Sequence, residues 1–288
     1  MSRAVILFHG FITDKDDFGN LPKLLEPLYD KVYCFTFPGH GKNPDYSKFT
    51  VDATFEKVLR KFDKLKSEYD VVDVIGFSMG GAVATYLTTV REVGKLVLLA
   101  PANKFLNPAM PFASGIFWFN KISEAISKVA GGENLKKVYK DTLATYMENE
   151  KITVDMAIKR LIPNYTYKTL STFNKIIKKC NANLTTIPNE MLVVWGKLDQ
   201  LVPIDSPHWL MSICTNENKK FLELNDISHL MLASKNADYV MNEIVAFLKV
   251  SNVEMANNER IVELENANNE SIERVEKEEN ERKNIPII

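Results

Sequence analysis

A serine placed between two glycines is the residue whose surroundings most clearly suggest chemistry. The segment 71–84 reads VVDVIGFSMGGAVA, so Ser78 lies in a Gly-x-Ser-x-Gly pentapeptide. A β-branched run precedes it and small residues follow it, as expected for a strand that turns at once into a helix. Such a turn holds the serine in a strained backbone conformation, with its hydroxyl above the sheet edge. Ser78 is therefore the predicted nucleophile.

A serine hydroxyl needs a base to become nucleophilic, and the usual base is a histidine held by a carboxylate. The chain has histidines at positions 9, 40, 208 and 229. Hydrolases with this kind of turn carry their residues in the order serine, acid, histidine. His229 follows the last strand-like run and fits that order, with His208 as a distant second choice. We expect His9 to shape the loop after the first strand rather than to act as a base.

The acid should lie in a loop that follows a strand between Ser78 and His229. The fourth strand-like run is followed by no carboxylate, whereas the loop after the fifth contains Asp199. We expect Asp205 to cap the next helix, and Asp226 stands too close in sequence to be aimed at the histidine. Asp199 is therefore the predicted acid, although a turn-capping aspartate would fit the same position.

Hydrolysis through a serine also needs donors for the oxyanion of the tetrahedral intermediate. The backbone N–H of Met79, at the start of the helix after Ser78, is one predicted donor, and the helix dipole favours negative charge there. The first strand-like run ends in His9-Gly10-Phe11. The glycine permits a turn, so the N–H of Phe11 is the second predicted donor.

Alternating strand-like and helix-like segments must position these residues. Short apolar runs predict buried strands at 4–8, 32–37, 71–75, 95–99, 191–195 and 221–224. Apolar residues at helical spacing predict helices at 16–29, 51–68, 80–89, 205–214 and 235–249. Strands and helices that alternate at this spacing form right-handed crossovers. The pattern therefore predicts an α/β fold with a mostly parallel sheet flanked by helices.

The alternation is interrupted over residues 101–190. A strand–helix–strand unit needs about 30 residues, so roughly 60 are surplus. They carry helix patterns at 116–129, 135–146, 153–161 and 169–177. We therefore expect an inserted helical cap. The predicted division is a core of residues 1–102 and 191–250, a cap of residues 103–190 and a tail of residues 251–288.

The predicted cap carries aromatic side chains that could form an apolar wall over the serine. Phe112, Phe117 and Trp118 are the predicted substrate-binding residues, with Phe105 and Phe119 near them in sequence. Ordinary packing of the cap on the core would explain any single one of them better. Contact between this cap and a membrane surface is left open.

The tail differs in composition from the rest of the chain. Residues 251–288 hold ten acidic and five basic residues, eight asparagines and no aromatic residue. Such a segment buries too little apolar surface to form a core. It is expected to be a solvated tail or a frayed helix.

The composition of the whole chain excludes several classes of protein. With 288 residues, 45% hydrophobic and 25% charged, it is typical of a globular protein. The net charge of −1 gives no reason to expect nucleic acid as a partner. Three scattered cysteines predict neither a disulfide framework nor a zinc site, and we expect no metal and no cofactor. No signal sequence or long apolar stretch is visible, which favours a cytoplasmic location.

Taken together, five segments resemble the α/β-hydrolase superfamily, and within it the small bacterial carboxylesterases and monoacylglycerol lipases. The resemblance covers about residues 4–250, with Ser228 where many relatives have glycine. It implies the α/β-hydrolase fold and ester hydrolysis through an acyl-serine, with a cap that covers an apolar acyl pocket. The segments are His9-Gly10-Phe11, Pro38-Gly39-His40-Gly41, Gly76-Phe77-Ser78-Met79-Gly80-Gly81, Gly196-Lys197-Leu198-Asp199-Gln200-Leu201-Val202-Pro203 and Ser228-His229.

The leading hypothesis is a serine carboxylester hydrolase with Ser78, Asp199 and His229 as its triad and a small-molecule acyl ester as its substrate. A thioesterase, a lysophospholipase or a carbon–carbon bond hydrolase would use the same triad, and the sequence does not separate them. A serine at this position excludes a haloalkane dehalogenase, which needs aspartate there. The remaining alternative is a non-catalytic binding module whose acidic tail recruits a partner. The sequence carries no prediction of oligomeric state.

Overall fold

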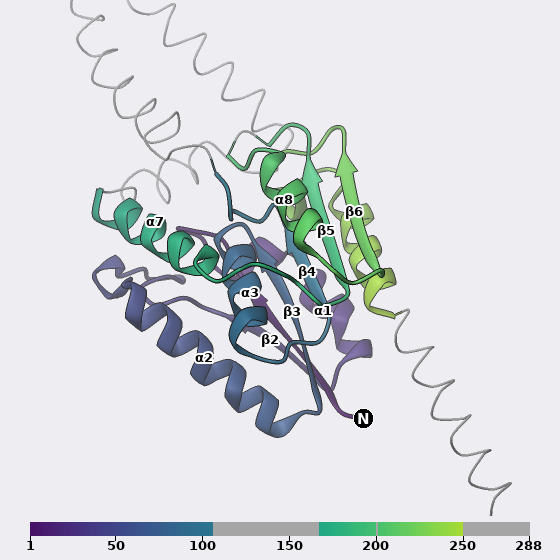
Figure 1. Ribbon diagram of the computed structural model, residues 1–288, viewed down its shortest axis with the longest axis horizontal. Helices are drawn as coiled ribbons and strands as arrows, with labels where there is room; N and C mark the ends of the chain where they lie inside the picture. Colours follow the sequence, from purple (N-terminus) through teal and green to yellow (C-terminus); the bar gives the residue numbers. More distant parts are fainter. Residues whose placement is uncertain (106–166, 200, 250–288) are drawn as a thin grey trace, which may run out of the picture. The chain divides into compact units, whose positions relative to one another are not determined.

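A computed structural model describes residues 1–105, 167–199 and 201–249 (Figure 1). Within these ranges a parallel sheet has the strand order β2-β1-β3-β4-β5-β6. This sheet and its flanking helices confirm the predicted α/β fold class. The strands are β1 Arg3–Phe8, β2 Lys31–Phe35, β3 Val71–Phe77, β4 Leu96–Leu99, β5 Met191–Gly196 and β6 Lys219–Leu224.

The strands in the middle of the sheet are apolar on both faces because helices cover both faces. Every residue of β1, β4 and β5 is buried, which explains why these runs show no polar alternation. Lys219–Leu224 forms an edge strand with half-buried and exposed residues. The core therefore lies on both sides of the central strands.

Helices connect successive strands, as the parallel arrangement requires. In Figure 1, α2, α3 and α7 lie side by side over one face of the sheet, and α3 and α2 both contact α7. Residues 237–249 are also helical. The named helices are α1 Leu21–Leu25, α2 Val51–Glu68, α3 Met79–Val90, α7 Tyr167–Asn181 and α8 Asp205–Ile213, with short 3₁₀ helices at Lys15–Phe18, Glu26–Leu28, Tyr46–Lys48 and Met231–Ala233.

The segment 16–29 differs from the single helix that its apolar spacing predicts. It consists of a 3₁₀ turn, the five residues of α1 and a second 3₁₀ turn. Gly19 ends the first turn at a positive φ of 51°. Pro22 and Pro27 each lie near the start of a short helix, because proline fits the first turn but interrupts a helix interior. The apolar spacing therefore predicts helical conformation correctly, but the predicted single helix is divided into three short pieces.

The predicted cap lies largely outside the described residues, as does the tail, so the division into core, cap and tail stays a prediction. Helix α7, assigned to the cap by its sequence position, packs on α3 and α2. Asn103 and Asn181 exchange hydrogen bonds: Asn103 Nδ2 donates to Asn181 Oδ1 at 2.9 Å, and Asn181 Nδ2 donates to the Asn103 carbonyl at 2.7 Å. The described segments on either side of residues 106–166 are therefore hydrogen-bonded to each other.

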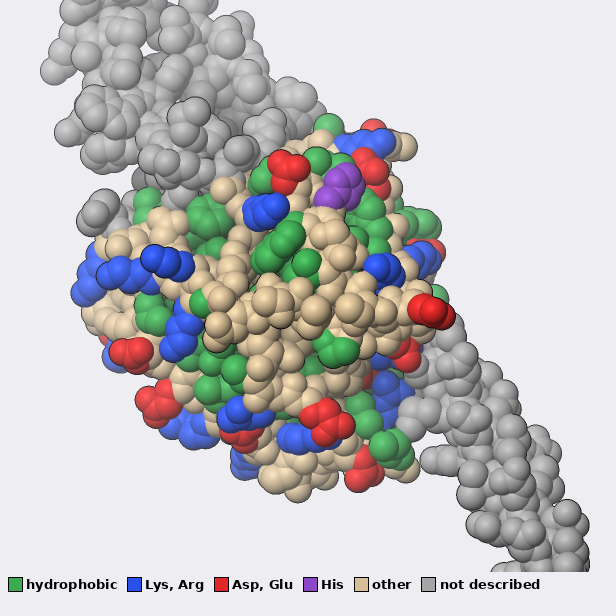
Figure 2. Space-filling model, viewed as in Figure 1, with side chains coloured by type: hydrophobic (Ala, Val, Ile, Leu, Met, Phe, Trp, Pro, Cys, Tyr) green, Lys and Arg blue, Asp and Glu red, His purple; other side chains and the backbone are tan. Residues whose placement is uncertain are grey.

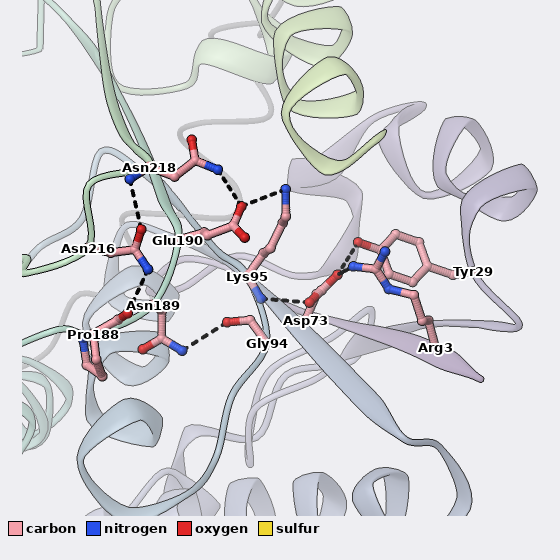
Figure 3. A network of polar contacts seen from close by, with 10 residues as sticks. All are labelled: Arg3, Tyr29, Asp73, Gly94, Lys95, Pro188, Asn189, Glu190, Asn216 and Asn218. Atoms are coloured by element: carbon pink, nitrogen blue, oxygen red, sulfur yellow. Dashed lines mark hydrogen bonds and ion pairs between the residues drawn. The ribbon is translucent and has the colours of Figure 1, made fainter. Parts of the chain in front are cut away.

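A network of buried polar groups lies at the amino ends of the strands (Figure 3). Asp73 on β3 is fully buried, and its Oδ2 accepts hydrogen bonds from Arg3 Nη2 and from the Tyr29 hydroxyl, both at 2.6 Å. Asp73 Oδ1 accepts the backbone N–H of Lys95 at 2.7 Å. Burial, with the adjacent carboxylate, raises the pKa of Tyr29, so its hydroxyl stays a donor.

The same network continues toward β5 and β6. Lys95 Nζ forms an ion pair with Glu190 Oε2 at 2.9 Å, and Asn218 Nδ2 donates to that oxygen at 2.6 Å. Asn189 Nδ2 donates to the Gly94 carbonyl at 2.9 Å. These bonds connect residues at or next to the amino ends of β4, β5 and β6, so the polar groups clamp one edge of the sheet.

Charges on the outer surface are mixed in sign. Figure 2 shows basic and acidic side chains interspersed over the described part of the face in view. No helix among the described residues combines the length and the apolar character that crossing a membrane requires.

Candidate active site

Ser78 occupies the sharp turn that its pentapeptide predicts. It lies between β3 and α3 with φ 54° and ψ −115°, a region that a residue with a side chain rarely adopts. Its backbone N–H donates to the Leu99 carbonyl at 2.9 Å, and its carbonyl accepts the N–H of Ala102 at 3.0 Å. The strained conformation is therefore held by bonds to β4 and the loop after it.

Two glycines make this turn sterically possible. A Cβ on Gly76 would lie 2.4 Å from the Gly80 carbonyl oxygen, so the strand and the helix touch across the turn. A Cβ on Gly80 would lie 2.0 Å from the Phe8 carbonyl oxygen, so the start of α3 rests directly on the end of β1. A side chain at position 76 would push α3 away from β3, and one at position 80 would push α3 away from β1.

The three residues selected by chain order lie together at the carboxyl ends of the strands. His229 Nε2 is 3.0 Å from Ser78 Oγ, and His229 Nδ1 is 2.8 Å from Asp199 Oδ2. All three residues are buried. Because the carboxylate can only accept, Nδ1 carries the proton and Nε2 is left to accept the serine hydroxyl. The arrangement can therefore pass a proton from Ser78 to the imidazole.

The two carboxylate oxygens of Asp199 have different hydrogen-bond partners. Oδ2 faces His229, while Oδ1 accepts the backbone N–H groups of Leu201 at 2.8 Å and Val202 at 2.9 Å. The turn-capping role and the role of histidine partner, which the sequence left as alternatives, are thus compatible in one side chain. The backbone bonds orient the carboxylate before any substrate arrives.

A third glycine brings the acid and histidine loops together. A Cβ on Gly196 would lie 2.1 Å from the Ile227 carbonyl oxygen. That carbonyl also accepts the N–H of Leu198 at 3.0 Å. The loop after β5 therefore runs against the loop after β6, which places Asp199 beside His229. Sequence reasoning did not assign Gly196 this role, although a glycine at the end of a buried strand often marks close backbone approach.

The loop after β1 contacts Phe77 and Gly80, which lie on either side of Ser78 in the sequence. A Cβ on Gly10 would lie 3.1 Å from the ring of Phe77, and the Phe77 ring centroid is 5.1 Å from that of His229. The start of α3 touches the same loop, because a Cβ on Gly80 would lie 2.6 Å from the His9 carbonyl oxygen. The predicted donors, the N–H groups of Phe11 and Met79, thus belong to adjoining backbone segments.

An aromatic surface extends from this loop toward α7. The ring of Phe11 stacks on Phe173 with centroids 4.8 Å apart and lies 5.8 Å from Phe49. Phe105 contacts Phe173 at 4.8 Å. Sequence reasoning did not single out Phe49 or Phe173. The predicted substrate-binding residues Phe112, Phe117 and Trp118, like Phe119, lie outside the described residues.

His40 and His208 contact groups other than Ser78. His40 is buried, its Nδ1 donates to the Pro38 carbonyl at 3.0 Å, and Nε2 has no partner among the described residues. Burial lowers the pKa of His40 to about 4, so its imidazole is neutral near pH 7. His208 is exposed on α8, 5.5 Å from the ring of Phe221.

The remaining acidic candidates, Asp226 and Asp205, are exposed, whereas Asp199 is buried. Asp205 was expected to cap α8, but Ile204 is the N-cap and Asp205 lies in the first turn. An acidic residue in that turn still interacts favourably with the helix dipole. Within the described ranges, no three His, Cys, Asp or Glu side chains are grouped as a metal would require.

Comparisons with known proteins identify the family to which the chain is similar. The model of the "Alpha/beta hydrolase family" matches residues 5–240. A 2-hydroxy-6-oxononadienedioate/2-hydroxy-6-oxononatrienedioate hydrolase of Pseudomonas putida is 31% identical over 219 residues, covering 70% of this chain and 74% of the relative. A carboxylesterase of Bacillus subtilis is 22% identical over 250 residues, covering 86% of this chain and 92% of the relative.

The fold is shared with solved structures of similar length. A soluble variant of monoglyceride lipase from Saccharomyces cerevisiae, solved with a substrate analog, superposes with a TM-score of 0.61 at 17% identity. The superposition covers 86% of this chain and 85% of that chain. At this identity the match shows a common fold.

Proposed function

Because the chain belongs to the alpha/beta hydrolase family, we propose that it is a serine carboxylester hydrolase acting on apolar acyl esters. The observation that carries the proposal is the hydrogen-bonded series from Asp199 through His229 to Ser78. A buried carboxylate, a histidine whose unprotonated nitrogen faces the hydroxyl, and a serine in a strained turn form the arrangement that nucleophilic acyl transfer needs.

In the first half of the reaction, Ser78 Oγ attacks the carbonyl carbon of the ester and its proton passes to His229 Nε2. Asp199 stabilises the imidazolium that forms, because its carboxylate lies 2.8 Å from Nδ1. The N–H groups of Met79 and Phe11 hold the oxyanion of the tetrahedral intermediate. The imidazolium then gives its proton to the departing alkoxide, which leaves an alcohol and an acyl-serine.

In the second half, a water molecule takes the place of the alcohol. His229 Nε2 accepts a proton from the water as its oxygen attacks the acyl carbon, and the same N–H groups hold the second oxyanion. The intermediate collapses, the carboxylic acid departs and Ser78 regains its proton from the imidazolium. The scheme uses only groups of this chain and water.

The aromatic surface beside the loop after β1 supports an apolar acyl group as part of the substrate. Phe11, Phe49, Phe173 and Phe105 form a continuous series of ring contacts. Aromatic rings bury large areas of apolar surface and orient through few rotatable bonds. We assign Phe112, Phe117 and Trp118 of the proposed cap to the same acyl site.

A carbon–carbon bond hydrolase is the second candidate, and one observation favours it. The Pseudomonas putida relative, named for cleavage of a dienedioate, is 31% identical over 219 residues. Its named substrate carries two carboxylates, which would need cationic partners in the pocket. The ring series formed by Phe11, Phe49, Phe173 and Phe105 favours a neutral acyl chain instead.

Hydrolysis assays on the wild-type protein and the Ser78→Ala variant test the proposal. We expect the wild type to hydrolyse p-nitrophenyl esters and monoacylglycerols, and the variant to lose roughly 10⁴-fold or more of kcat. Acyl thioesters, lysophospholipids and a vinylogous diketo acid, run in parallel, separate the alternatives. Ester turnover that is unchanged in Ser78→Ala would contradict the proposal.

A further inference from the structure

His9 is a fully buried imidazole that contacts two backbone groups of the loops around the proposed site. Its Nε2 accepts the N–H of Phe37 at 3.2 Å, and its Nδ1 lies 2.7 Å from the Gly10 carbonyl oxygen. An N–H can only donate, so Nε2 is the unprotonated nitrogen. Nδ1 therefore carries the proton and donates it to the Gly10 carbonyl. The end of β1 is thereby tied to Phe37, two residues beyond the end of β2.

The Gly10 carbonyl belongs to the same planar peptide group as the N–H of Phe11. No cis peptide bond occurs in the described residues, so this carbonyl and this N–H point in opposite directions. Fixing the carbonyl against His9 consequently fixes the direction of the Phe11 N–H. Glycine has low barriers to backbone rotation, so without such an anchor the peptide group could turn over.

A second anchor holds the other side of Gly10. The Gly10 N–H donates to Asp17 Oδ2 at 3.1 Å, and the Thr13 hydroxyl donates to the same oxygen. Ile12, two residues after Gly10, is held at a positive φ of 62°. Both peptide groups that flank Gly10 are therefore bonded to buried or half-buried side chains. The loop is arranged before any substrate binds, which is the condition for effective stabilisation of an oxyanion.

We propose that His9 is a positioning residue, whose Nδ1–H holds the Gly10 carbonyl so that the Phe11 N–H faces the oxyanion. The loop lies at the correct place for this role, because it contacts Phe77 and Gly80 on either side of Ser78. The inference rests on the proposed function, since an oxyanion forms only if Ser78 attacks an acyl group. His9 itself touches no reacting atom and is not a catalytic residue.

Two amide substitutions separate the two hydrogen bonds of the imidazole. In His9→Asn the amide nitrogen takes the place of Nδ1, so the donor to the Gly10 carbonyl is kept and the acceptor for Phe37 is lost. In His9→Gln the amide oxygen takes the place of Nε2, so the acceptor is kept and the donor is lost. His9→Ala removes both, and His208→Ala removes an exposed imidazole as the control.

We expect kcat for a p-nitrophenyl ester to fall about 100-fold in His9→Gln and in His9→Ala, the cost of losing one oxyanion donor. His9→Asn should keep kcat within about 10-fold of the wild type, and His208→Ala should equal it. KM should change little in any variant, because the ground-state ester does not depend on this N–H. An alkylboronic acid, whose serine adduct is tetrahedral, should lose affinity in parallel with kcat.

The outcomes distinguish this inference from the proposed function. A wild type that hydrolyses no ester overturns the proposed function and this inference with it. A wild type that is active, a Ser78→Ala variant that is inactive and a His9→Gln variant with full kcat overturn this inference alone. Equal losses in His9→Asn and His9→Gln, tracking their melting temperatures, would assign His9 a purely structural role. If His9→Ala does not fold, the two amide variants still decide.

Discussion

Buried polar groups lie both at the carboxyl ends and at the amino ends of the strands, here called the carboxyl edge and the amino edge of the sheet. The two sets of groups are arranged for different purposes. At the carboxyl edge, the bonds run in one direction from Asp199 through His229 and end on the hydroxyl of Ser78. At the amino edge, the carboxylate of Asp73 accepts hydrogen bonds from the donors around it, and Arg3 is its ion-pair partner. This network does not end on a reactive group. The first series ends on a hydroxyl that can attack a substrate, whereas the network around Asp73 serves to hold the strands together.

The side chains of the carboxyl edge and of the amino edge also lie in different kinds of element. The carboxyl-edge residues lie in turns that follow β3, β5 and β6, where the backbone can place a side chain over the sheet. At the amino edge, Arg3 and Asp73 lie within β1 and β3. Activity and stability should therefore be separable by substitution, and the following predictions test that separation.

The largest effect is expected at the carboxyl edge. His229→Ala removes the proposed base and should lower kcat for esters roughly 10⁴-fold or more. The free energy of unfolding should change far less than on breaking the amino-edge network, because the imidazole lies in a loop. Urea unfolding measured beside the ester assay checks this. A loss of activity that only follows a loss of folded protein would contradict the separation.

Breaking the amino edge should have the reverse effect. Asp73→Asn removes the carboxylate charge that pairs with the buried Arg3 and should lower the free energy of unfolding by about 3–5 kcal/mol. The kcat of the folded fraction should stay at the wild-type value. The exposed pair of Arg60 and Glu56 is a matched control, whose loss should cost about 0.5 kcal/mol or less. A fall in kcat at unchanged stability would show that the edges are coupled.

A pH titration sharpens the comparison further, because His40 is buried in the loop after β2 and its Nε2 has no partner within the described part of the chain. Burial lowers its pKa from 6.5 to about 4. The unfolded chain therefore binds a proton that the folded chain excludes, and stability falls as the pH drops from about 6.5 to about 4. The loss attributable to His40 should approach about 3 kcal/mol.

His40→Phe isolates this contribution, since the aromatic surroundings of Phe49 and Tyr46 suit an apolar ring. The difference in unfolding free energy between the variant and the wild type should change across that pH range. Hydrogen bonds lower the pKa values of Asp45 and Asp70, so these carboxylates titrate at lower pH, and their contributions are common to both proteins and cancel in the comparison. Parallel pH profiles of the two proteins would contradict the role assigned to His40.

Chain order was enough to bring the candidate site together from sequence. Ser78, Asp199 and His229 each follow a strand, and parallel strands end at a common edge, so their convergence required only the strand assignments to be right. The bounds of α2 were also predictable, because Thr50 caps a helix with a continuous apolar stripe.

Long-range polar pairing could not be predicted in this way. Asp73 stands in an apolar run that reads as a strand, and nothing local indicates that Arg3, 70 residues away, neutralises it. Asp17 accepts the backbone N–H of Gly10, and Gly196 lies against the backbone of Ile227. Neither contact follows from the local sequence pattern. Periodicity reports which face of an element is apolar and carries no information on which charges meet.

Labelling with a fluorophosphonate tests the central claim most directly, because the reagent forms a bond only with a hydroxyl that its surroundings have made nucleophilic. The account predicts one adduct on the folded wild-type protein, located by mass spectrometry at Ser78 and absent from Ser78→Ala. His229→Ala should label at a rate lower by orders of magnitude. A folded wild type that takes up no label at Ser78, or that labels equally fast without His229, would contradict the account.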